Sequence, residues 1–279
     1  MQFWKVHGAR NDFVLVDETE EEVVPESDKP DFARWACNRR SGIGADGVVF
    51  IRSDPPSVEM RVFNRDGSEA EFCGNAARCV VKYVTEVRGE NVKVLRTLSG
   101  VHRVGVLGGW IAVEVPEAEI KKVVELGYEV DAGVPHFVRL TERDPVRDFR
   151  SLTDDAKAIF SEYESIGGVN VTYAAPSVEE LRVRTFERGV GWTPACGSGV
   201  VAASLVYSEI FGPFDEVSVR TAGGSLRVSL SDGPLLIGTA EIVYKGELRG
   251  DWRENTDHQR RRYSLSRSPS GCPRLQKCR

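Results

Sequence analysis

Short runs of alternating apolar and polar residues recur along the whole chain, and they predict a protein made mainly of β-strands. Residues 58–63 (VEMRVF) show this alternation most clearly. It is typical of strands because every second side chain of a strand points to the same face of a sheet. Glycine and proline clusters between the runs indicate turns. We expect strands at 2–7, 13–17, 48–52, 58–63, 92–98, 103–107, 110–115, 128–131, 171–174, 181–186, 217–221, 226–230 and 235–244.

Four other segments have the spacing of apolar residues that is typical of helices. They cover residues 31–40, 73–87, 151–163 and 196–211. The second and fourth are rich in alanine and valine, and such small side chains allow a helix to lie inside a curled sheet. These two helices are therefore the expected centres of the fold.

The two alanine- and valine-rich helices also begin alike, because each follows a Cys-Gly pair and a small polar residue. The matching residues are Cys73, Gly74 and Asn75 in the first unit, and Cys196, Gly197 and Ser198 in the second. They lie 123 positions apart, nearly half of residues 1–248, which indicates a duplication. We predict an α+β fold of two pseudo-symmetric domains, each a mixed, mainly antiparallel sheet curled around a central helix. The active site is expected in the cleft between them.

The expected domains are residues 1–115 and 116–248, with the last strand able to return to the first domain. Residues 249–279 differ from both, because they lack apolar periodicity and hold nine Lys and Arg against three Asp and Glu. We expect a basic, disordered tail there. A tether to an anionic partner is the alternative. The acidic remainder of the chain argues against nucleic acid as a main partner.

Composition places the chain among globular proteins, with 41% hydrophobic and 28% charged residues in 279. It contains no apolar run of the ~20 residues that a membrane helix needs, and its N-terminus does not resemble a signal peptide. A cytoplasmic protein without a membrane partner is expected. The six cysteines form no Cys-x-x-Cys pair and only four histidines are present, so we expect no metal site.

A cysteine at a helix start can do specific chemistry. The first N–H groups of a helix are unpaired and carry partial positive charge, so they bind carboxylates and favour a thiolate. Two such helix starts facing each other would hold one carboxylate and place a sulfur on each side of its α-carbon. One sulfur would remove the α-proton and the other would return a proton from the opposite side. The alternative is that both cysteines are small core residues, which is common for free cysteines.

A glycine pattern earlier in the chain invites a second interpretation. Gly42, Gly44 and Gly47 have the Gly-x-Gly-x-x-Gly spacing of a dinucleotide-binding loop. That loop requires a strand before it and a helix after it, and here the predicted order is reversed. We therefore expect no nucleotide cofactor.

Six motifs in order give the chain a resemblance to diaminopimelate epimerase, a member of the two-cysteine racemases and epimerases. They span residues 1 to about 248 and read GARNDF (8–13), SGIGADG (41–47), NRDGSEAEFCGNAAR (64–78), GVPHFV (133–138), TFERG (185–189) and ACGSG (195–199). The resemblance implies an isomerase of lysine biosynthesis that acts without a cofactor. It also implies a homodimer and a small amino-acid substrate.

The resemblance also implies roles for individual residues. Cys73 and Cys196 would be the two catalytic bases. Those expected to hold the reacting carboxylate are Gly74, Asn75, Gly197 and Ser198. Those expected to recognise the distal end of the substrate are Asn11, Asn64, Asn170 and Arg188. Glu187 is expected both to bind the substrate and to act in catalysis. Family members often carry asparagine and glutamine where this chain has Val134 and Gly47.

The cysteines need help to ionise. A helix terminus contributes about 0.3–2 kcal/mol and one pKa unit corresponds to ~1.4 kcal/mol, so a thiol pKa would fall from about 8.5 to about 7.5. Such a thiol is still largely protonated at neutral pH. We expect a neighbouring base, either Glu187 or the His136 that follows Pro135, and the sequence leaves open which assists which cysteine.

The leading hypothesis is a cofactor-independent epimerase that converts LL- to meso-diaminopimelate. A racemase of proline, hydroxyproline or histidine from the same superfamily is the alternative, and a thiol-redox or metal-binding protein is a remote one. Arg188 and the asparagines favour a substrate with a distal carboxylate and amine, because an arginine fork pairs bidentately with a carboxylate.

Overall fold

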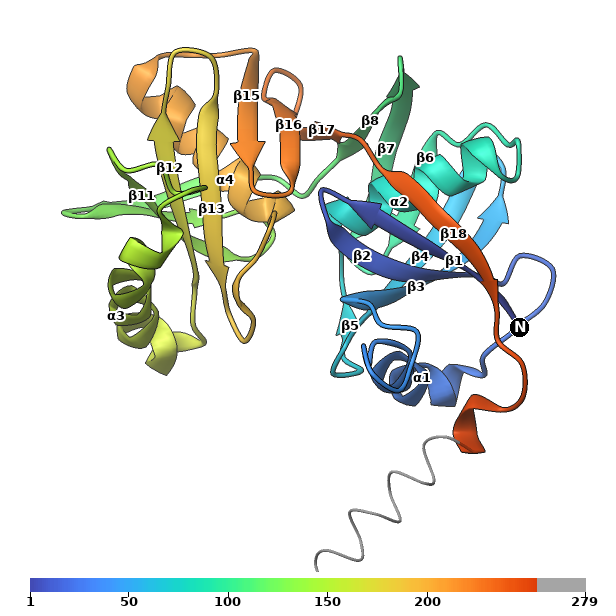
Figure 1. Ribbon diagram of the computed structural model, residues 1–279. Helices are drawn as coiled ribbons and strands as arrows, with labels where there is room; N and C mark the ends of the chain where they lie inside the picture. The colour runs from blue at the N-terminus through green and yellow to red at the C-terminus, as the bar shows by residue number, and fades with distance from the viewer. Residues whose placement is uncertain (255–279) are drawn as a thin grey trace, which may run out of the picture.

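The computed structural model describes residues 1–254, which form two lobes joined by extended chain (Figure 1). The first half of the chain contains, in order, β1 (Gln2–Gly8), β2 (Asn11–Asp17), α1 (Lys29–Ala36), β3 (Gly47–Asp54), β4 (Ser57–Asn64), β5 (Glu69–Ala70), α2 (Gly74–Glu86), β6 (Val94–Thr97), β7 (Gly100–Leu107), β8 (Trp110–Glu114) and β9 (Glu119–Val124). A short 3-10 helix, η1 (Glu26–Asp28), precedes α1.

The second half of the chain repeats this order. It contains β10 (Gly127–Asp131), β11 (Pro135–Leu140), α3 (Thr153–Tyr163), β12 (Asn170–Pro176), β13 (Leu181–Glu187), β14 (Gly191–Trp192), α4 (Gly197–Phe211), β15 (Glu216–Thr221), β16 (Gly224–Ser229), β17 (Leu235–Gly238) and β18 (Glu241–Glu247). The 3-10 helices η2 (Phe149–Leu152) and η3 (Glu164–Ile166) flank α3.

Strand pairing repeats as well. In the first half β2 pairs with β3 and β4 with β6 in parallel, while β1·β2, β3·β4 and β6·β7 are antiparallel. In the second half β11·β12 and β13·β15 are parallel, while β10·β11, β12·β13 and β15·β16 are antiparallel. The same two parallel steps in the same places confirm the predicted two-domain, mainly antiparallel α+β fold.

The chain crosses between the lobes at the end of each half. Strand β9 pairs with β10 of the second lobe, and β18 pairs with β1 of the first. Strands β8 and β17 pair with each other and join the two sheets. In Figure 1 this pair lies between the lobes. The position of the boundary at Pro116 stays a prediction.

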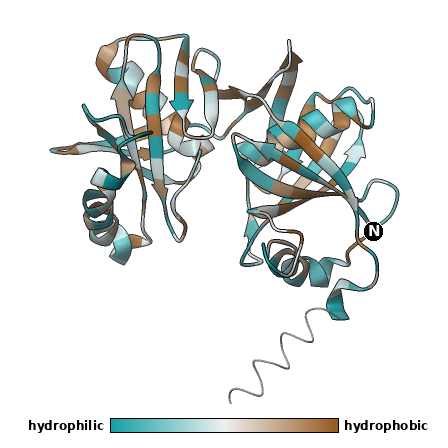
Figure 2. Ribbon diagram, in the orientation of Figure 1, coloured by the Kyte–Doolittle hydropathy of each residue, from teal (hydrophilic) through white to brown (hydrophobic). Residues whose placement is uncertain are grey.

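Helices α2 and α4 are the buried centres of the lobes. Ala76, Ala77 and Val80 of α2 are completely buried against strands of the first sheet, as are Ala202, Ala203 and Val206 of α4 against the second. The strands around them alternate apolar and polar residues (Figure 2), as half-buried strands do. No helix within residues 1–254 is long and apolar enough to cross a bilayer.

The structure corrects the predicted start of the tail. Residues 249–254 belong to the first lobe, because Trp252 is 7% exposed and packs against Phe32, with ring centroids 5.3 Å apart. Arg253 donates a hydrogen bond to Asp28 at 3.1 Å. One aromatic residue among polar ones produces no periodicity, so the sequence pattern did not reveal it. The rest of the predicted tail, 255–279, lies outside the described residues.

The structure also divides one predicted strand and adds strands that were not predicted. The expected strand 235–244 is two strands, because β17 pairs in the second lobe and β18 in the first, and the chain crosses between them at Thr239 and Ala240. Strands β9 and β11 were not predicted. In β9 no residue is fully buried, and such an exposed strand shows little alternation.

Candidate active site

Cys73 and Cys196 occupy the same position in the two lobes, immediately before the first residue of α2 and α4. Both have extended backbone, with φ/ψ of −148°/109° and −113°/116°. The structure thus confirms the two predicted helix starts. Because the first N–H groups of a helix have no partner within the helix, each cysteine lies beside free backbone donors.

The two helix starts meet at one side chain, Leu236 of β17. A Cβ on Gly74 would lie 2.8 Å from Leu236 Cδ2, and a Cβ on Gly197 would lie 3.0 Å from the same atom. A Cβ at either position would require the Leu236 side chain to move, so glycine lets both helix starts contact Leu236 as it stands. Both Cys-Gly pairs thus share one contact between the lobes.

Asn75 connects the lobes directly. Its Nδ2 donates to the carbonyl oxygen of Ala195 at 3.3 Å, next to Cys196, and to Asn11 Oδ1 at 3.2 Å. Asn11 Oδ1 also lies 4.0 Å from Cys73 Sγ, close enough to accept a thiol hydrogen bond. The structure thus brings Asn11, Asn75 and both cysteines together.

Burial decides the protonation of Cys73. It raises the pKa of this thiol, and the negative charge of Glu187 adds to the increase. The N–H groups of Asn75 and Ala76 and the positive charge of Arg78 act in the opposite direction. We expected the helix start to lower the pKa to about 7.5; instead the cost of burying a thiolate outweighs the donors.

Cys196 has acidic and hydroxyl neighbours. Burial raises its pKa and the carboxylate of Glu187 raises it further, while hydrogen bonds from Ser198 and the Gly199 N–H lower it. Ser198 Oγ lies 3.4 Å from the sulfur. Glu187 shares a hydrogen bond with the Cys196 thiol and accepts another from Thr193. Burial raises the pKa of Glu187 too, so this carboxylate is a stronger proton acceptor than an exposed glutamate.

His136 lies behind Ser198. Its Nε2 is 2.9 Å from Ser198 Oγ and its Nδ1 is 3.0 Å from Thr172 Oγ1, so both ring nitrogens have hydroxyl partners. Burial lowers the pKa of His136 to about 3, which keeps the ring neutral. His136 therefore reaches Cys196 only through Ser198, whereas Glu187 contacts Cys196 itself.

The residues expected at the distal end of a substrate fall into two groups. Asn170 Oδ1 accepts from the backbone N–H of Arg188 at 2.9 Å, so these two lie together in the second lobe. Arg188 is exposed and its guanidinium donates to the Gly167 carbonyl. Asn64 is exposed at the end of β4 in the first lobe, where its Nδ2 donates to Ser68 at 3.0 Å.

Asp46 and Thr193 are contacts of the site that the sequence analysis missed. Asp46 accepts from Asn11 Nδ2 at 3.1 Å, which turns Asn11 Oδ1 toward Cys73 and Asn75. Thr193 donates to Glu187. Asp46 stands in the motif SGIGADG and Thr193 three residues before Cys196, so proximity to the motifs was the available signal.

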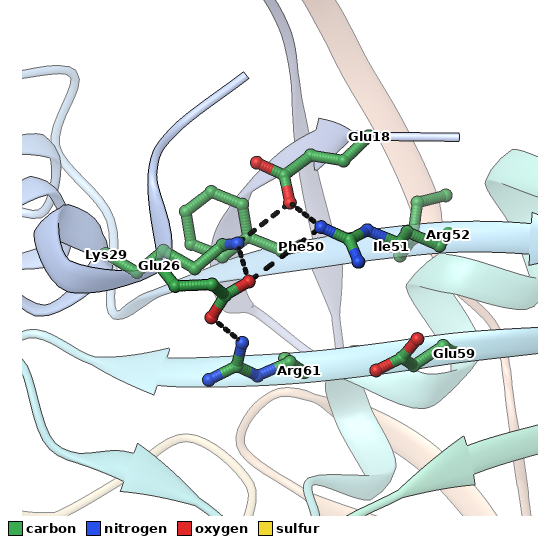
Figure 3. A pocket seen from close by; sticks show the side chains of 8 residues that line it. All are labelled: Glu18, Glu26, Lys29, Phe50, Ile51, Arg52, Glu59 and Arg61. Carbon is green, nitrogen blue, oxygen red and sulfur yellow. Dashed lines mark hydrogen bonds and ion pairs between the residues drawn. The ribbon is translucent and has the colours of Figure 1, made fainter. Parts of the chain in front are cut away.

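A hollow on the first lobe lies apart from the cysteines (Figure 3). Most of its charged groups are paired, with Glu59 as the exception in Figure 3. Lys29, which is 1% exposed, pairs with Glu18 at 3.0 Å and also with Glu26. Arg61 pairs with Glu26 and Glu69. This network joins α1 to β3 and β4 and is complete without a ligand. Its lining residues are Glu18, Glu26, Lys29, Phe50, Ile51, Arg52, Glu59 and Arg61.

Solved structures of low sequence identity to this chain have the same fold. A phenazine biosynthesis PhzC/PhzF protein from Clostridium difficile superimposes with a TM-score of 0.68 at 15% identity, covering 90% of this chain and 100% of that one. A hydroxyproline epimerase from Agrobacterium vitis superimposes with a TM-score of 0.63 at 15% identity, covering 88% and 91%. At such identities the likeness establishes the fold alone.

Closer relatives share one description. The family model described as diaminopimelate epimerase matches residues 3–127 and 128–247. The chain is 92% identical over 279 residues to the diaminopimelate epimerase of Methanopyrus kandleri, covering all of both chains. It is 37% identical to that of Archaeoglobus fulgidus, covering 88% of this chain and 96% of the other. The chain therefore belongs to the diaminopimelate epimerase family.

Proposed function

We propose that this protein interconverts LL- and meso-2,6-diaminopimelate without a cofactor, as a step of lysine biosynthesis. The single observation that carries the proposal is the convergence of two cysteine-bearing helix starts on Leu236. A substrate carboxylate held by the free N–H groups of both helices would have Cys73 on one side of its α-carbon and Cys196 on the other. The family relationship supports the identity of the substrate.

The proposed reaction needs one thiolate and one thiol. Glu187 takes the proton of Cys196, which then removes the α-proton of the substrate; the electron pair of the broken C–H bond stays on the substrate. The Cys73 thiol delivers its proton to the other side of that carbon, and the stereocentre is inverted. In the reverse direction the two sulfurs exchange roles.

The developing negative charge is stabilised by groups already in place. The N–H groups of Asn75 and Ala76 act at Cys73 and that of Gly199 at Cys196. Donors of both helices would therefore lie beside a carboxylate bound between the two cysteines. Such preorganised donors stabilise charge more strongly when water is excluded.

The other end of the substrate is assigned to Arg188, Asn64 and Asn170. Arg188 would exchange its contact with the Gly167 carbonyl for the distal carboxylate, which a guanidinium binds bidentately. The asparagines would hold the distal amine and carboxylate. We further propose a homodimer, as the family resemblance implies, and a cytoplasmic location, because reducing compartments keep such thiols free.

A substrate panel in deuterated water tests the proposal. LL-diaminopimelate should gain one α-deuterium as the meso form appears, without added pyridoxal phosphate and in the presence of a chelator. Proline, histidine and glutamate should exchange poorly, because each leaves polar groups of the site unpaired. Faster exchange of proline or histidine would identify a different substrate, and no exchange of any amino acid would refute the proposal.

A further inference from the structure

Arg78 of α2 is a buried cation without a counter-ion among residues 1–254. Its side chain is 0% exposed and donates three hydrogen bonds, to Gly74 O at 3.1 Å, to Asn75 Oδ1 at 2.6 Å and to Thr239 O at 3.4 Å. All three acceptors are uncharged, and no carboxylate of residues 1–254 forms an ion pair with it. A buried charge without a partner is strongly unfavourable, so such an arginine calls for an explanation.

The fold itself does not require an arginine at this position. Arg78 follows Cys73 by five residues, and Val201 follows Cys196 by five residues at the matching position of α4. Val201 is 1% exposed and packs in the apolar core of the second lobe. The same helix in the same kind of sheet is therefore stable with a small apolar side chain, and the guanidinium is specific to the Cys73 half.

The hydrogen bonds of Arg78 decide how Asn75 is oriented. A carboxamide has a donor end and an acceptor end, and Arg78 donates to the acceptor, Oδ1. The donor, Nδ2, is thereby directed at Asn11 and at Ala195 of the other lobe. The bond to Thr239 fixes the guanidinium to the segment where the chain crosses between lobes.

The charge of Arg78 also acts on the sulfur beside it. The ionisable groups that interact with Arg78 are the thiols of Cys73 and Cys79. Cys79 is completely buried, and burial raises its pKa. Cys73 is half-buried and stands at the helix start. Of the two, Cys73 is the one that a reagent or a substrate proton can reach.

We propose that Arg78 is a positioning residue of the active site, which fixes the Asn75 carboxamide toward the second lobe and stabilises negative charge at Cys73 and on the bound carboxylate. The part that concerns the substrate rests on the proposed function; the part that concerns Cys73 does not. Other charged groups that act on Cys73 are Glu187 of β13, and the thiols of Cys79 and Cys196 when ionised.

The first test is the pH dependence of Cys73 alkylation by iodoacetamide, followed by mass spectrometry of the peptide that carries Cys73. In Arg78→Met the midpoint should rise by at least about one pH unit, because the cation that favours the thiolate is gone. In Arg78→Lys it should stay within about half a unit of the wild type. An unchanged midpoint in a folded Arg78→Met variant refutes the electrostatic role.

Arg184→Met is the matched control. Arg184 is half-buried rather than fully buried, and like Arg78 it has no ion pair among the described residues. Its guanidinium lies 4.4 Å from the ring of Phe149 in the second lobe. Burial lowers its pKa, as it does for Arg78. Removing it should leave the Cys73 midpoint unchanged. A shift as large as that of Arg78→Met would mean that general destabilisation, not the local charge, moves the thiol.

The second test is a double-mutant cycle on turnover with Arg78→Met and Asn75→Ala. Misplacement of a site group by about 1 Å costs on the order of 100-fold, so Arg78→Met should lower kcat by about 10- to 100-fold. In the Asn75→Ala background Arg78→Met should lower kcat by less than about threefold, because the carboxamide that Arg78 orients is absent. If the fold-losses in kcat of the two single variants multiply in the double variant, the two residues act independently, and positioning through Asn75 is refuted.

Arg78→Lys separates charge from geometry and serves if the methionine variant does not fold. Lysine keeps the positive charge but cannot bind Gly74, Asn75 and Thr239 with one planar fork. It should retain the alkylation midpoint and lose turnover. If it retains full turnover, positioning by the guanidinium is refuted. Absence of activity in the wild type would refute the proposed function and leave the alkylation test of Arg78 intact.

Discussion

The surroundings of the two cysteines differ far more than the backbone that holds them. Both stand before the central helix of a lobe, and both helix starts contact Leu236. Cys73 lies among the amides of Asn11 and Asn75 and near the cation Arg78. Cys196 lies beside Glu187, a hydroxyl and, one step further, a neutral imidazole.

Matching positions show how the duplicated halves diverged. Asn64 ends β4 nine residues before Cys73, and Glu187 ends β13 nine residues before Cys196. Arg78 in the first half likewise corresponds to Val201 in the second. The first half thus carries a cation where the second is apolar, and the second carries a carboxylate where the first has an amide.

The different surroundings of the two cysteines show that a symmetric backbone can favour different protonation states at its two sulfurs. In the proposed mechanism Glu187 is the proton acceptor of Cys196, whereas the proposed role of Arg78 is to stabilise negative charge at Cys73 without accepting a proton. A two-base reaction needs one sulfur charged and the other protonated at any moment, and unequal neighbours provide this. The following changes test the comparison in order of expected effect.

Replacing either sulfur should remove activity. Cys73→Ser and Cys196→Ser should each lower the rate of epimerisation by at least about 10³-fold, because general acid–base catalysis contributes about 10²–10⁴-fold and a serine hydroxyl ionises poorly. Conversion of LL- to meso-diaminopimelate measures this, with circular dichroism as the folding control. Substantial activity in either folded variant would contradict the need for two thiols.

Removing the carboxylate beside Cys196 should have the next largest effect. Glu187→Gln should lower kcat by about 10²-fold, since the thiol loses its proton acceptor. The pKa of Cys196 should fall at the same time, because the negative charge of Glu187 contributes to its elevation. Alkylation of Cys196 against pH measures that fall.

A suitable control is Glu180→Gln, which removes a carboxylate paired with Arg220 at 3.1 Å in the same lobe. It should change neither kcat nor the alkylation profile. If Glu187→Gln lowers the pKa of Cys196 and leaves kcat intact, Glu187 is a bystander and the asymmetry has another purpose.

The proposed recognition of the substrate uses residues of both lobes, and Arg188 should contribute most. Arg188→Ala should lower kcat/KM by about 10²-fold, because the distal carboxylate loses its charged partner. Asn64→Ala and Asn170→Ala should each cost less, about 5- to 30-fold or roughly 1–2 kcal/mol, as lost neutral partners. Steady-state kinetics measure this, with Arg220→Ala as an unaffected control. Equal losses in all four variants would indicate a structural cause.

The buried imidazole of the second lobe should make stability depend on pH. The pKa of His136 is lowered to about 3 in the folded state, so between about pH 6.5 and 3 the unfolded chain binds more protons and stability falls as pH falls. From pH 7 to 5.5 the wild type should lose about 1 kcal/mol more than His136→Gln. Urea unfolding at both pH values measures this, and equal losses would contradict a neutral His136.

The fold was predictable to the extent that its pattern is local. Residues 58–63 alternate between apolar and polar because β4 is buried on one side. Runs of alanine and valine indicated the helices α2 and α4. Strand β9 is not buried on either side and leaves little pattern. Trp252 could not be found in this way, because its partners Phe32 and Trp35 are more than 200 positions away.

The sequence predicted which residues lie near one another in the site better than it predicted the contacts among them. The repeated Cys-Gly pairs indicated two helix starts, and the motifs indicated Asn75, His136 and Glu187. The sequence could not show that Leu236 joins the helix starts, or that Ser198 stands between His136 and Cys196. The sequence analysis also gave too little weight to the burial of the two thiols. Burial raises their pKa values, whereas the helix start alone would lower them.

The most direct test of the central claim, two sulfurs on opposite sides of one carbon, is the isotope content at early reaction times in deuterated water. Unlabelled LL-diaminopimelate should give meso product that carries one solvent deuterium from the first turnovers, while the remaining LL substrate stays almost unlabelled. This follows because the sulfur that removes the proton differs from the solvent-exchanged sulfur that returns one. Early meso product that retains its original hydrogen would mean that a single base works on both sides, and would contradict the account.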